Sequence, residues 1–178
     1  MYWTNYIYGE IVRANMDGTS SYPIVTGQRS PAGIVIDYEF ARLYWVDYYD
    51  NVIKSSDLDG QEVYTVANLG SSPRVYPGGI DILNDRSLYW TTESSGIYRC
   101  NLTTACDVIE FVYTPSVELA DLKLVHSSRQ PVEGSRFKRR LDPCESDPCS
   151  DIWALRPNSY SCLCPSGMEQ AEDGHTCK

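Results

Sequence analysis

Cysteine carries the clearest chemical signal in this sequence. The chain has 178 residues and seven cysteines, with one Cys-x-Cys and no Cys-x-x-Cys. Close, uneven spacing of this kind is typical of a disulfide framework formed in an oxidising compartment. Only two histidines occur, His126 and His175, so a histidine-rich metal site is excluded. An odd number of cysteines also leaves at least one thiol without a partner in the chain.

Catalytic motifs are missing from the sequence. Gly-x-Ser-x-Gly, His-Glu-x-x-His, Gly-x-Gly-x-x-Gly and Gly-Lys-Ser/Thr do not occur, so we predict no enzyme and no cofactor. Asp47, Asp57 and Asp59 could be read as paired carboxylates, but their place in a repeat favours structural hydrogen bonding. His126 could sense endosomal pH, or it could be an exposed bystander. A net charge of −9 argues against a nucleic-acid partner.

Two segments could be modified after synthesis. Asn101-Leu102-Thr103 is an N-glycosylation sequon, and a hairpin loop would expose it. The polar stretch 127–141 contains the chain's basic cluster, which resembles the cut site of furin-type proprotein convertases. A plain solvated linker, or a contact with an acidic surface, are the alternatives. The cluster consists of Arg136, Phe137, Lys138, Arg139 and Arg140.

An aromatic motif occurs three times in the chain. The elements that contain it must position the cysteines, the sequon and the other candidate groups named above. Its copies are Tyr2-Trp3-Thr4-Asn5, Tyr44-Trp45-Val46-Asp47 and Tyr89-Trp90-Thr91-Thr92, with tryptophans 42 and 45 positions apart. A Pro-x-Gly-Ile run precedes each later copy, at Pro31 and Pro77, and an Ile-containing run and an apolar pair follow. Each repeat therefore predicts about four short strands. A period of this length is typical of propeller blades.

Each motif also predicts how its repeat packs and turns. Neighbouring strand residues point to opposite faces, so Tyr-Trp indicates that both faces are covered, as in stacked blades; a β-sandwich is the alternative. Asp17-Gly18 and Asp59-Gly60 predict tight two-residue hairpin turns. In the third repeat Thr103-Thr104 replace Asp-Gly. A disulfide between Cys100 and Cys106, which flank this turn, would clamp it.

Taken in order, these motifs resemble the YWTD repeats of the low-density-lipoprotein receptor family. His126 to Pro131 is similar to that family's exit from its propeller, and the cysteine-rich end is similar to its EGF-like module. The resemblance implies an all-β fold with about three of the six blades of a YWTD propeller. It also implies three regions: residues 1–126 in an incomplete ring, a linker at 127–141 and an EGF-like domain at 142–178.

The resemblance further implies the pairing of the remaining cysteines. The family's EGF module has six, but Trp153 stands where the third is expected. Cys149 should then pair with Cys162, and Cys164 with Cys177, which leaves Cys144 free or bridged to another molecule. Only part of the family's calcium-ligand set precedes Cys144, so we predict no calcium.

The function implied by the resemblance is non-catalytic. We expect an extracellular module of an endocytic or signalling receptor that binds protein ligands or assists their release; the alternative is a matrix adhesion module, as in nidogen-like proteins. No apolar run approaches the roughly 20 residues of a membrane span, and no export signal precedes Tyr2. We therefore expect a segment of a longer, membrane-anchored protein. Open blade edges should favour pairing with a missing half or a second copy.

Overall fold

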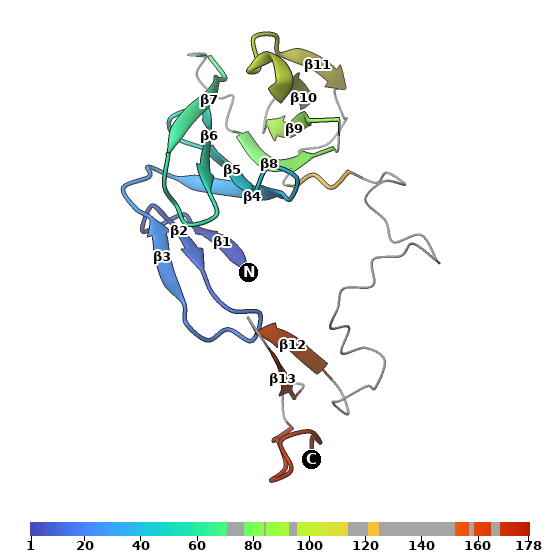
Figure 1. Ribbon diagram of the computed structural model, residues 1–178. Coiled ribbons are helices and arrows are strands. Elements are labelled where there is room, and N and C mark those ends of the chain that lie inside the picture. Colours follow the sequence, from blue (N-terminus) through green and yellow to red (C-terminus); the bar gives the residue numbers. More distant parts are fainter. Residues whose placement is uncertain are drawn as a thin grey trace. The chain divides into compact units, whose positions relative to one another are not determined.

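The structure, a computed structural model, describes residues 1–70, 77–83, 85–92, 96–113, 121–124, 152–156, 159–164 and 168–178. In these ranges the regular elements are strands and one short 3-10 helix, so the predicted all-β fold is confirmed (Figure 1). The chain forms two compact units. The larger unit comprises Tyr2–Val12 and Pro23–Val132, and the smaller unit comprises Met1, Arg13–Tyr22 and Glu133–Lys178.

Three antiparallel sheets carry the three sequence repeats. In sheets 2 and 3 the Pro-x-Gly-Ile run forms the first strand and the Tyr-Trp run the second, as predicted. Sheet 1 begins directly at its Tyr-Trp strand. The strands are β1 (Tyr2–Asn5), β2 (Glu10–Arg13) and β3 (Tyr22–Val25) in sheet 1; β4 (Pro31–Asp37), β5 (Arg42–Asp47), β6 (Val52–Asp57) and β7 (Tyr64–Asn68) in sheet 2; and β8 (Pro77–Ile82), β9 (Ser87–Thr92), β10 (Gly96–Asn101) and β11 (Glu110–Tyr113) in sheet 3.

The Tyr-Trp strand of sheet 2 has both of its faces buried. Tyr44 is 2% exposed and Trp45 is 0% exposed. Trp45 packs in a cluster with Ile11 and Val25 of sheet 1. Tyr44 packs in a second cluster, which contains Trp90 of sheet 3. Because adjacent strand residues point in opposite directions, the two aromatic rings join the middle sheet to both neighbours. The prediction of stacked blades is therefore confirmed.

Two glycines of the Pro-x-Gly-Ile runs allow neighbouring chain segments to approach closely. A Cβ atom on Gly33 would lie 2.4 Å from the carbonyl oxygen of Gly78 in β8, and a Cβ atom on Gly79 would lie 2.4 Å from the backbone nitrogen of Leu122. No side chain fits in such a space, so glycine is required at both positions. The motif thus fixes the approach of β4 to β8 and of β8 to the segment Asp121–Leu124.

The hairpin turns differ from the predicted two-residue form. In sheet 1 the Gly18 N–H donates to the Asn15 carbonyl at 3.0 Å, and in sheet 2 the Gly60 N–H donates to the Asp57 carbonyl at 3.2 Å. Both glycines have positive φ, at 83° and 80°, whereas neither preceding aspartate does. The prediction was wrong in this detail: a four-residue turn that ends on a left-handed glycine reverses the chain, so only the glycine needs positive φ.

The third repeat turns through a 3-10 helix, η1 (Leu102–Thr104), and non-glycine residues. Ala105 and Cys106 adopt positive φ of 51° and 56°. A disulfide joins Cys100 to Cys106, the pair that flanks this turn in the sequence.

The strand predicted at Asp121–His126 is not present in its described part, Asp121–Leu124. Its backbone is instead held by a side chain, since the Leu124 N–H donates to a carboxylate oxygen of Asp81 in β8 at 2.9 Å. Val125 and His126 lie outside the described residues, as do the predicted domain boundaries at 126 and 141.

The smaller unit contains β12 (Ile152–Arg156) and β13 (Ser159–Leu163), which form an antiparallel pair. A disulfide joins Cys164 to Cys177. Cys162 is also disulfide-bonded, and its partner lies outside the described residues. Asp173 accepts hydrogen bonds from the Thr176 hydroxyl and from the N–H groups of His175 and Thr176. These bonds lower the pKa of the Asp173 carboxyl to about 2.

Candidate protein-binding surface

An exposed aromatic surface is formed by two turns of the larger unit. The turn between β1 and β2 exposes Ile7 at 85% and Tyr8 at 75%, and the turn between β5 and β6 exposes Tyr49 at 59%. The two turns touch where the rings of Tyr6 and Tyr48 meet edge to face, with centroids 6.0 Å apart. We call the set Tyr6, Ile7, Tyr8, Arg29, Tyr48 and Tyr49 the aromatic turn surface.

Hydrogen bonds of the backbone hold the surface together. The Gly9 carbonyl accepts from the Gln28 N–H at 2.9 Å, and the Ser30 carbonyl accepts from the Tyr48 N–H at 2.8 Å. The segment from Gln28 to Ser30, which leads into β4, therefore bridges the two turns. Because it is fixed at both ends, the exposed rings project from an ordered support.

The buried carboxylate of Asp47 anchors this support from below. Asp47 is 0% exposed. Its oxygens accept from the N–H groups of Arg29 at 3.1 Å, Ser30 at 3.2 Å and Asp50 at 3.3 Å. The Lys54 ammonium, at 3.3 Å, pairs with the same carboxylate. A buried carboxylate is tolerated only when it is well paired, and these four donors satisfy that requirement.

Arg29 lies on the surface and combines charge with an aromatic contact. Its guanidinium carbon lies 3.9 Å from the centroid of the Tyr49 ring, a cation–π geometry. The same guanidinium lies 3.5 Å from Asp50. Tyrosine and arginine are the residue types enriched in the energetic centres of protein interfaces. The arrangement therefore has the composition of a protein interface and contains no reacting group.

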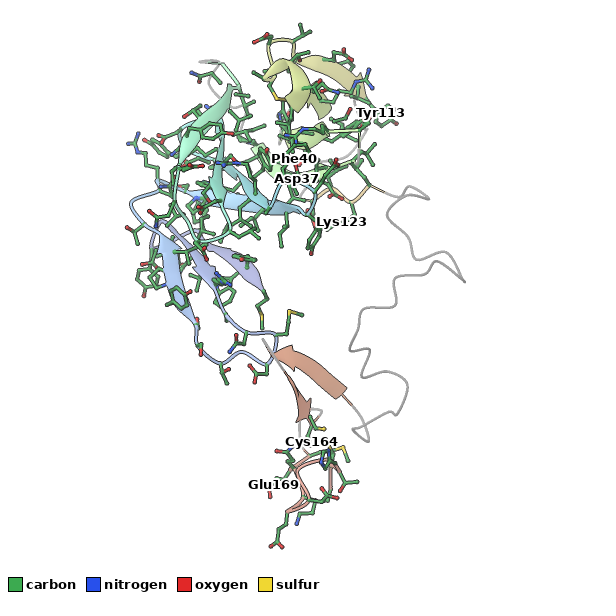
Figure 2. All side chains as sticks on the ribbon, viewed as in Figure 1. Asp37, Phe40, Tyr113, Lys123, Cys164 and Glu169 are labelled. Carbon is green, nitrogen blue, oxygen red and sulfur yellow. A yellow bond between two sulfur atoms is a disulfide. The ribbon has the colours of Figure 1, made fainter. Side chains whose placement is uncertain are left out.

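The opposite end of β5 is closed by a different cluster, which joins sheets 2 and 3. Arg86 of the β8–β9 turn lies 3.7 Å from the centroid of the Phe40 ring and 3.2 Å from the Asp37 carboxylate. Figure 2 shows Phe40 and Asp37 together at the end of β4. Tyr44, within reach of the same guanidinium, has its pKa raised because it is buried. This cluster is built for stability, since its charges are paired.

The structure does not bring the carboxylates of Asp47, Asp57 and Asp59 together. Asp47 and Asp57 lie at opposite ends of the β5–β6 ladder. Asp57 accepts the N–H groups of Asp59 and Gln61 at 3.0 and 2.7 Å. Asp47 and Asp57 therefore act as hydrogen-bond acceptors of the turns. Among the described residues, no group of three histidine, cysteine or acidic side chains could hold a metal ion.

The glycosylation candidate Asn101 lies at the start of η1 and is partly exposed. Its side-chain oxygen accepts from the Thr103 N–H at 2.8 Å and from the Thr103 hydroxyl at 2.5 Å. Its amide nitrogen, which would carry the glycan, donates to the Asp85 carbonyl at 3.3 Å. In the folded chain this nitrogen is occupied, so we expect any glycan to be added before the turn closes.

Other predicted sites lie outside the described residues. They are Cys144, Cys149, His126 and the basic cluster of Arg136, Lys138, Arg139 and Arg140.

Of the motif residues, Trp90 is 1% exposed and Trp3 is 36% exposed. Tyr2 packs against the Trp45 cluster, and Tyr89 pairs with Arg99 in the β9–β10 ladder.

Sequence reasoning did not identify Arg29, Tyr49 or Tyr8 as surface residues. A usable signal was present, because aromatic residues follow the motif directly in both of the first two repeats: Tyr6-Ile7-Tyr8 after Asn5, and Tyr48-Tyr49 after Asp47. Residues that follow a strand at a fixed repeat position share one edge of successive sheets. Arg29 had no such signal, since its role depends on a hydrogen bond across the fold.

Comparisons with known proteins find relatives of this chain among receptors. It is 31% identical over 183 residues to a vitellogenin receptor of Solenopsis invicta, a match that covers 100% of the chain and 10% of the receptor. It is 30% identical over 145 residues to human low-density lipoprotein receptor-related protein 4, which covers 81% of the chain and 7% of that protein. The chain therefore spans a tenth or less of these relatives. No family model matches it.

A solved structure shares the fold of the larger part of the chain. The crystal structure of a nidogen/laminin complex matches with a TM-score of 0.58 and 23% identity, over 66% of this chain and 45% of that one. Together with the repeated sheets, this likeness supports three blades of a β-propeller. No helix that could cross a membrane occurs in the part of the chain that the structure describes.

Proposed function

Because the chain belongs to the low-density-lipoprotein receptor family, we propose that it is a non-catalytic, extracellular protein-binding module of an endocytic or signalling receptor. Both relatives carry the word receptor in their names, and one is named for vitellogenin. The disulfides Cys100–Cys106 and Cys164–Cys177 support an extracellular location, since such bonds persist in oxidising compartments.

The aromatic turn surface is the observation that carries the proposal. Single exposed apolar residues are common on proteins, but this surface gathers four tyrosines, an isoleucine and an arginine on two adjoining turns and the segment that bridges them. A rigid support lowers the entropic cost of binding, because few side chains need to be ordered when the ligand arrives. The hydrogen bonds of Asp47 supply that support.

The matrix adhesion module is the second candidate. It shares the fold, but a likeness of 23% identity to the nidogen structure carries the fold alone. The receptor assignment is preferred because the more similar sequences are receptors.

Binding of the whole chain to two purified proteins separates the two candidates. Vitellogenin tests the receptor assignment, and laminin tests the adhesion assignment, with each probe measured by biolayer interferometry. We expect binding to vitellogenin. We expect the double variant Tyr8→Ala/Tyr49→Ala to weaken that binding by at least about 30-fold, the size of one interface hot spot.

The matched control is Tyr38→Ala. Tyr38 is 83% exposed and lies in the β4–β5 turn, at the other end of β5. This variant should bind as the unchanged chain does. Binding to laminin in place of vitellogenin would support the adhesion module, and equal losses from the two variants would contradict the role of the aromatic turn surface.

A further inference from the structure

The glycosylation sequon Asn101-Leu102-Thr103 lies inside the loop that a disulfide closes. Cys100 directly precedes the sequon, and the disulfide joins it to Cys106, six positions further along the chain. Both cysteines are buried, whereas Thr103 lies at the surface. The candidate site for a glycan is therefore reached by solvent and is at the same time part of a closed covalent ring.

Within this ring the groups that identify a sequon are already hydrogen-bonded. The Asn101 side-chain oxygen accepts from the Thr103 N–H at 2.8 Å and from the Thr103 hydroxyl at 2.5 Å. The Asn101 amide nitrogen donates to the Asp85 carbonyl at 3.3 Å. A transferase that reads the sequon must contact the asparagine amide and the threonine hydroxyl. These bonds consequently have to open before the enzyme can act.

The ring is also docked on the neighbouring turn between β8 and β9. The Leu102 N–H donates to the Arg86 carbonyl at 3.0 Å, next to the Asp85 carbonyl that holds the Asn101 amide. Arg86 is fixed in turn by its ion pair with Asp37 of sheet 2, at 3.2 Å. Because these contacts join separate turns, they form only when sheet 3 has folded. Folding of the sheet and closure of the ring therefore hide the acceptor together.

The disulfide holds a conformation that the residues of this turn do not favour. Ala105 and Cys106 have φ of 51° and 56°, in the left-handed region that side-chain-bearing residues rarely adopt. The hairpin of sheet 2 uses Gly60 for the same purpose. A covalent ring restricts the open states of a loop, so its formation shifts the turn toward the closed form. Without the disulfide, the sequon should open more often.

We propose that closure of the Cys100–Cys106 disulfide sets the glycan occupancy of Asn101, so that the chain is produced as two glycoforms. Chains that close the ring first remain unmodified, and chains that meet the transferase first carry the glycan. The inference rests on the extracellular location in the proposed function, because both modifications then take place in one oxidising secretory compartment.

The two competing reactions use different atoms of the same short segment. In glycosylation the Asn101 amide nitrogen bonds to C1 of an oligosaccharide on a lipid pyrophosphate. The bond from C1 to the pyrophosphate oxygen breaks, the amide proton passes to a base of the enzyme, and the lipid pyrophosphate leaves. In ring closure the Cys100 and Cys106 thiols form the S–S bond, and two electrons and two protons pass to a disulfide-bonded oxidoreductase.

Expression of the whole chain in cultured animal cells, with an added leader that directs it into the secretory pathway, tests the proposal. Mass spectrometry of peptides gives the ratio of glycosylated to unmodified Asn101. We expect partial occupancy in the unchanged chain and a several-fold higher ratio in Cys100→Ser/Cys106→Ser. The upper bound is roughly 30-fold, the shift in turn closure that so small a ring supplies in a chain-entropy description.

A second pair of variants keeps both cysteines and changes only how readily the turn closes. Ala105→Val places a β-branched residue in the left-handed region, which opposes closure, so occupancy should rise. Ala105→Gly removes the strain, so occupancy should fall. Glycan addition precedes closure in this scheme, and chains retained inside the cell are therefore as informative as secreted ones.

The matched control removes the other described disulfide. Cys164→Ser/Cys177→Ser opens a ring of the smaller unit and should leave the occupancy of Asn101 unchanged, whereas a general delay in folding would raise occupancy in both double variants. Thr103→Ala destroys the sequon and should abolish the glycan, which confirms that the signal comes from Asn101.

Four results would overturn the proposal. They are full occupancy in the unchanged chain, no rise in Cys100→Ser/Cys106→Ser, an equal rise in the Cys164→Ser/Cys177→Ser control, and opposite responses of the two Ala105 variants to those expected. Because the leader fixes the compartment, none of these results bears on the receptor assignment, which the vitellogenin measurement tests separately.

Discussion

The turns that close sheets 2 and 3 solve the same problem with different chemistry. In sheet 2 the chain reverses at Gly60, with φ of 80°, and the Asp57 carboxylate accepts two backbone N–H groups of the turn. In sheet 3 the reversal passes through Ala105 at a φ of 51°, and a disulfide closes the turn. The Asn101 side chain accepts the Thr103 N–H in place of the carboxylate, and a covalent bond stands where the other repeat uses glycine.

The strand ends differ in the same way. β5 ends at the buried Asp47, which accepts four hydrogen bonds, whereas β9 ends at Thr92, which is 2% exposed. The packing positions of the two repeats nevertheless correspond, because Leu43 and Leu88 are both fully buried next to their motif tryptophans. The comparison teaches that packing defines the blade, while the chemistry that closes its ends can vary.

Replacement of Asp47 by alanine should have the largest effect on this comparison. It leaves three backbone N–H groups without their acceptor and the Lys54 ammonium with only Gln28 and Asp50 as partners. Removal of one partner of a buried ion pair costs about 3–5 kcal/mol. Urea denaturation followed by tryptophan fluorescence measures the loss, since Trp45 and Trp90 are buried. Thr92→Val should cost less, because it removes a single hydroxyl.

Asp50→Ala is the matched control for this variant. Asp50 pairs with Arg29 at 3.5 Å and Lys54 at 3.6 Å, but its side chain is 34% exposed. Such pairs contribute about 0–1 kcal/mol. Equal losses from Asp47→Ala and Asp50→Ala would show that the burial of Asp47 is not what stabilises the strand end.

Removal of the disulfide of sheet 3 should have an intermediate effect. In a chain-entropy description, a ring as small as Cys100–Cys106 contributes about 2 kcal/mol, so Cys100→Ser/Cys106→Ser should lower the free energy of unfolding by that amount. Native-state hydrogen exchange gives the local readout through the Cys106 amide, which donates to the Asn101 carbonyl at 3.0 Å. Its protection should fall more than that of the Gln28 amide, which lies in the segment that supports the aromatic turn surface. A uniform loss at both amides would contradict a locally acting clamp.

The sequence was sufficient to predict the repeated packing but not the surface it supports. Tyr44 and Trp45 predicted two covered faces because strand periodicity is a local property of the chain. Cys100 and Cys106 were recognisable because they flank a turn without its glycine. The contact of Arg29 with Tyr49 depends on the Arg29 N–H reaching Asp47, 18 positions away, and spacing in the sequence does not encode that distance. The strand predicted at Asp121–His126 is absent from its described part for a similar reason, because strand pairing depends on the fold and not on the local sequence.

Ala105→Gly should have the smallest effect, and its sign is informative. An L-residue in the left-handed region costs roughly 1–2 kcal/mol, and glycine avoids most of this cost. The unfolded chain of the glycine variant is more flexible, and this offsets about 0.4–1 kcal/mol of the stability gained in the folded state. The net gain in unfolding free energy should therefore be below about 1 kcal/mol, measurable as a small shift of the urea midpoint.

The reverse change in sheet 2 tests whether the two turns are true counterparts. Gly60→Ala should destabilise the chain by more than Ala105→Gly stabilises it, for two reasons. The added Cβ atom would lie 2.1 Å from the Ile24 carbonyl oxygen, and the backbone at this position has a φ of 80°. Ala105 has no such obstacle to remove, and the disulfide already holds its conformation. If Ala105→Gly gave a larger gain once Cys100 and Cys106 were replaced by serine, the disulfide would be the device that maintains a strained alanine. An unchanged gain would instead show that the left-handed turn is fixed by the neighbouring strands.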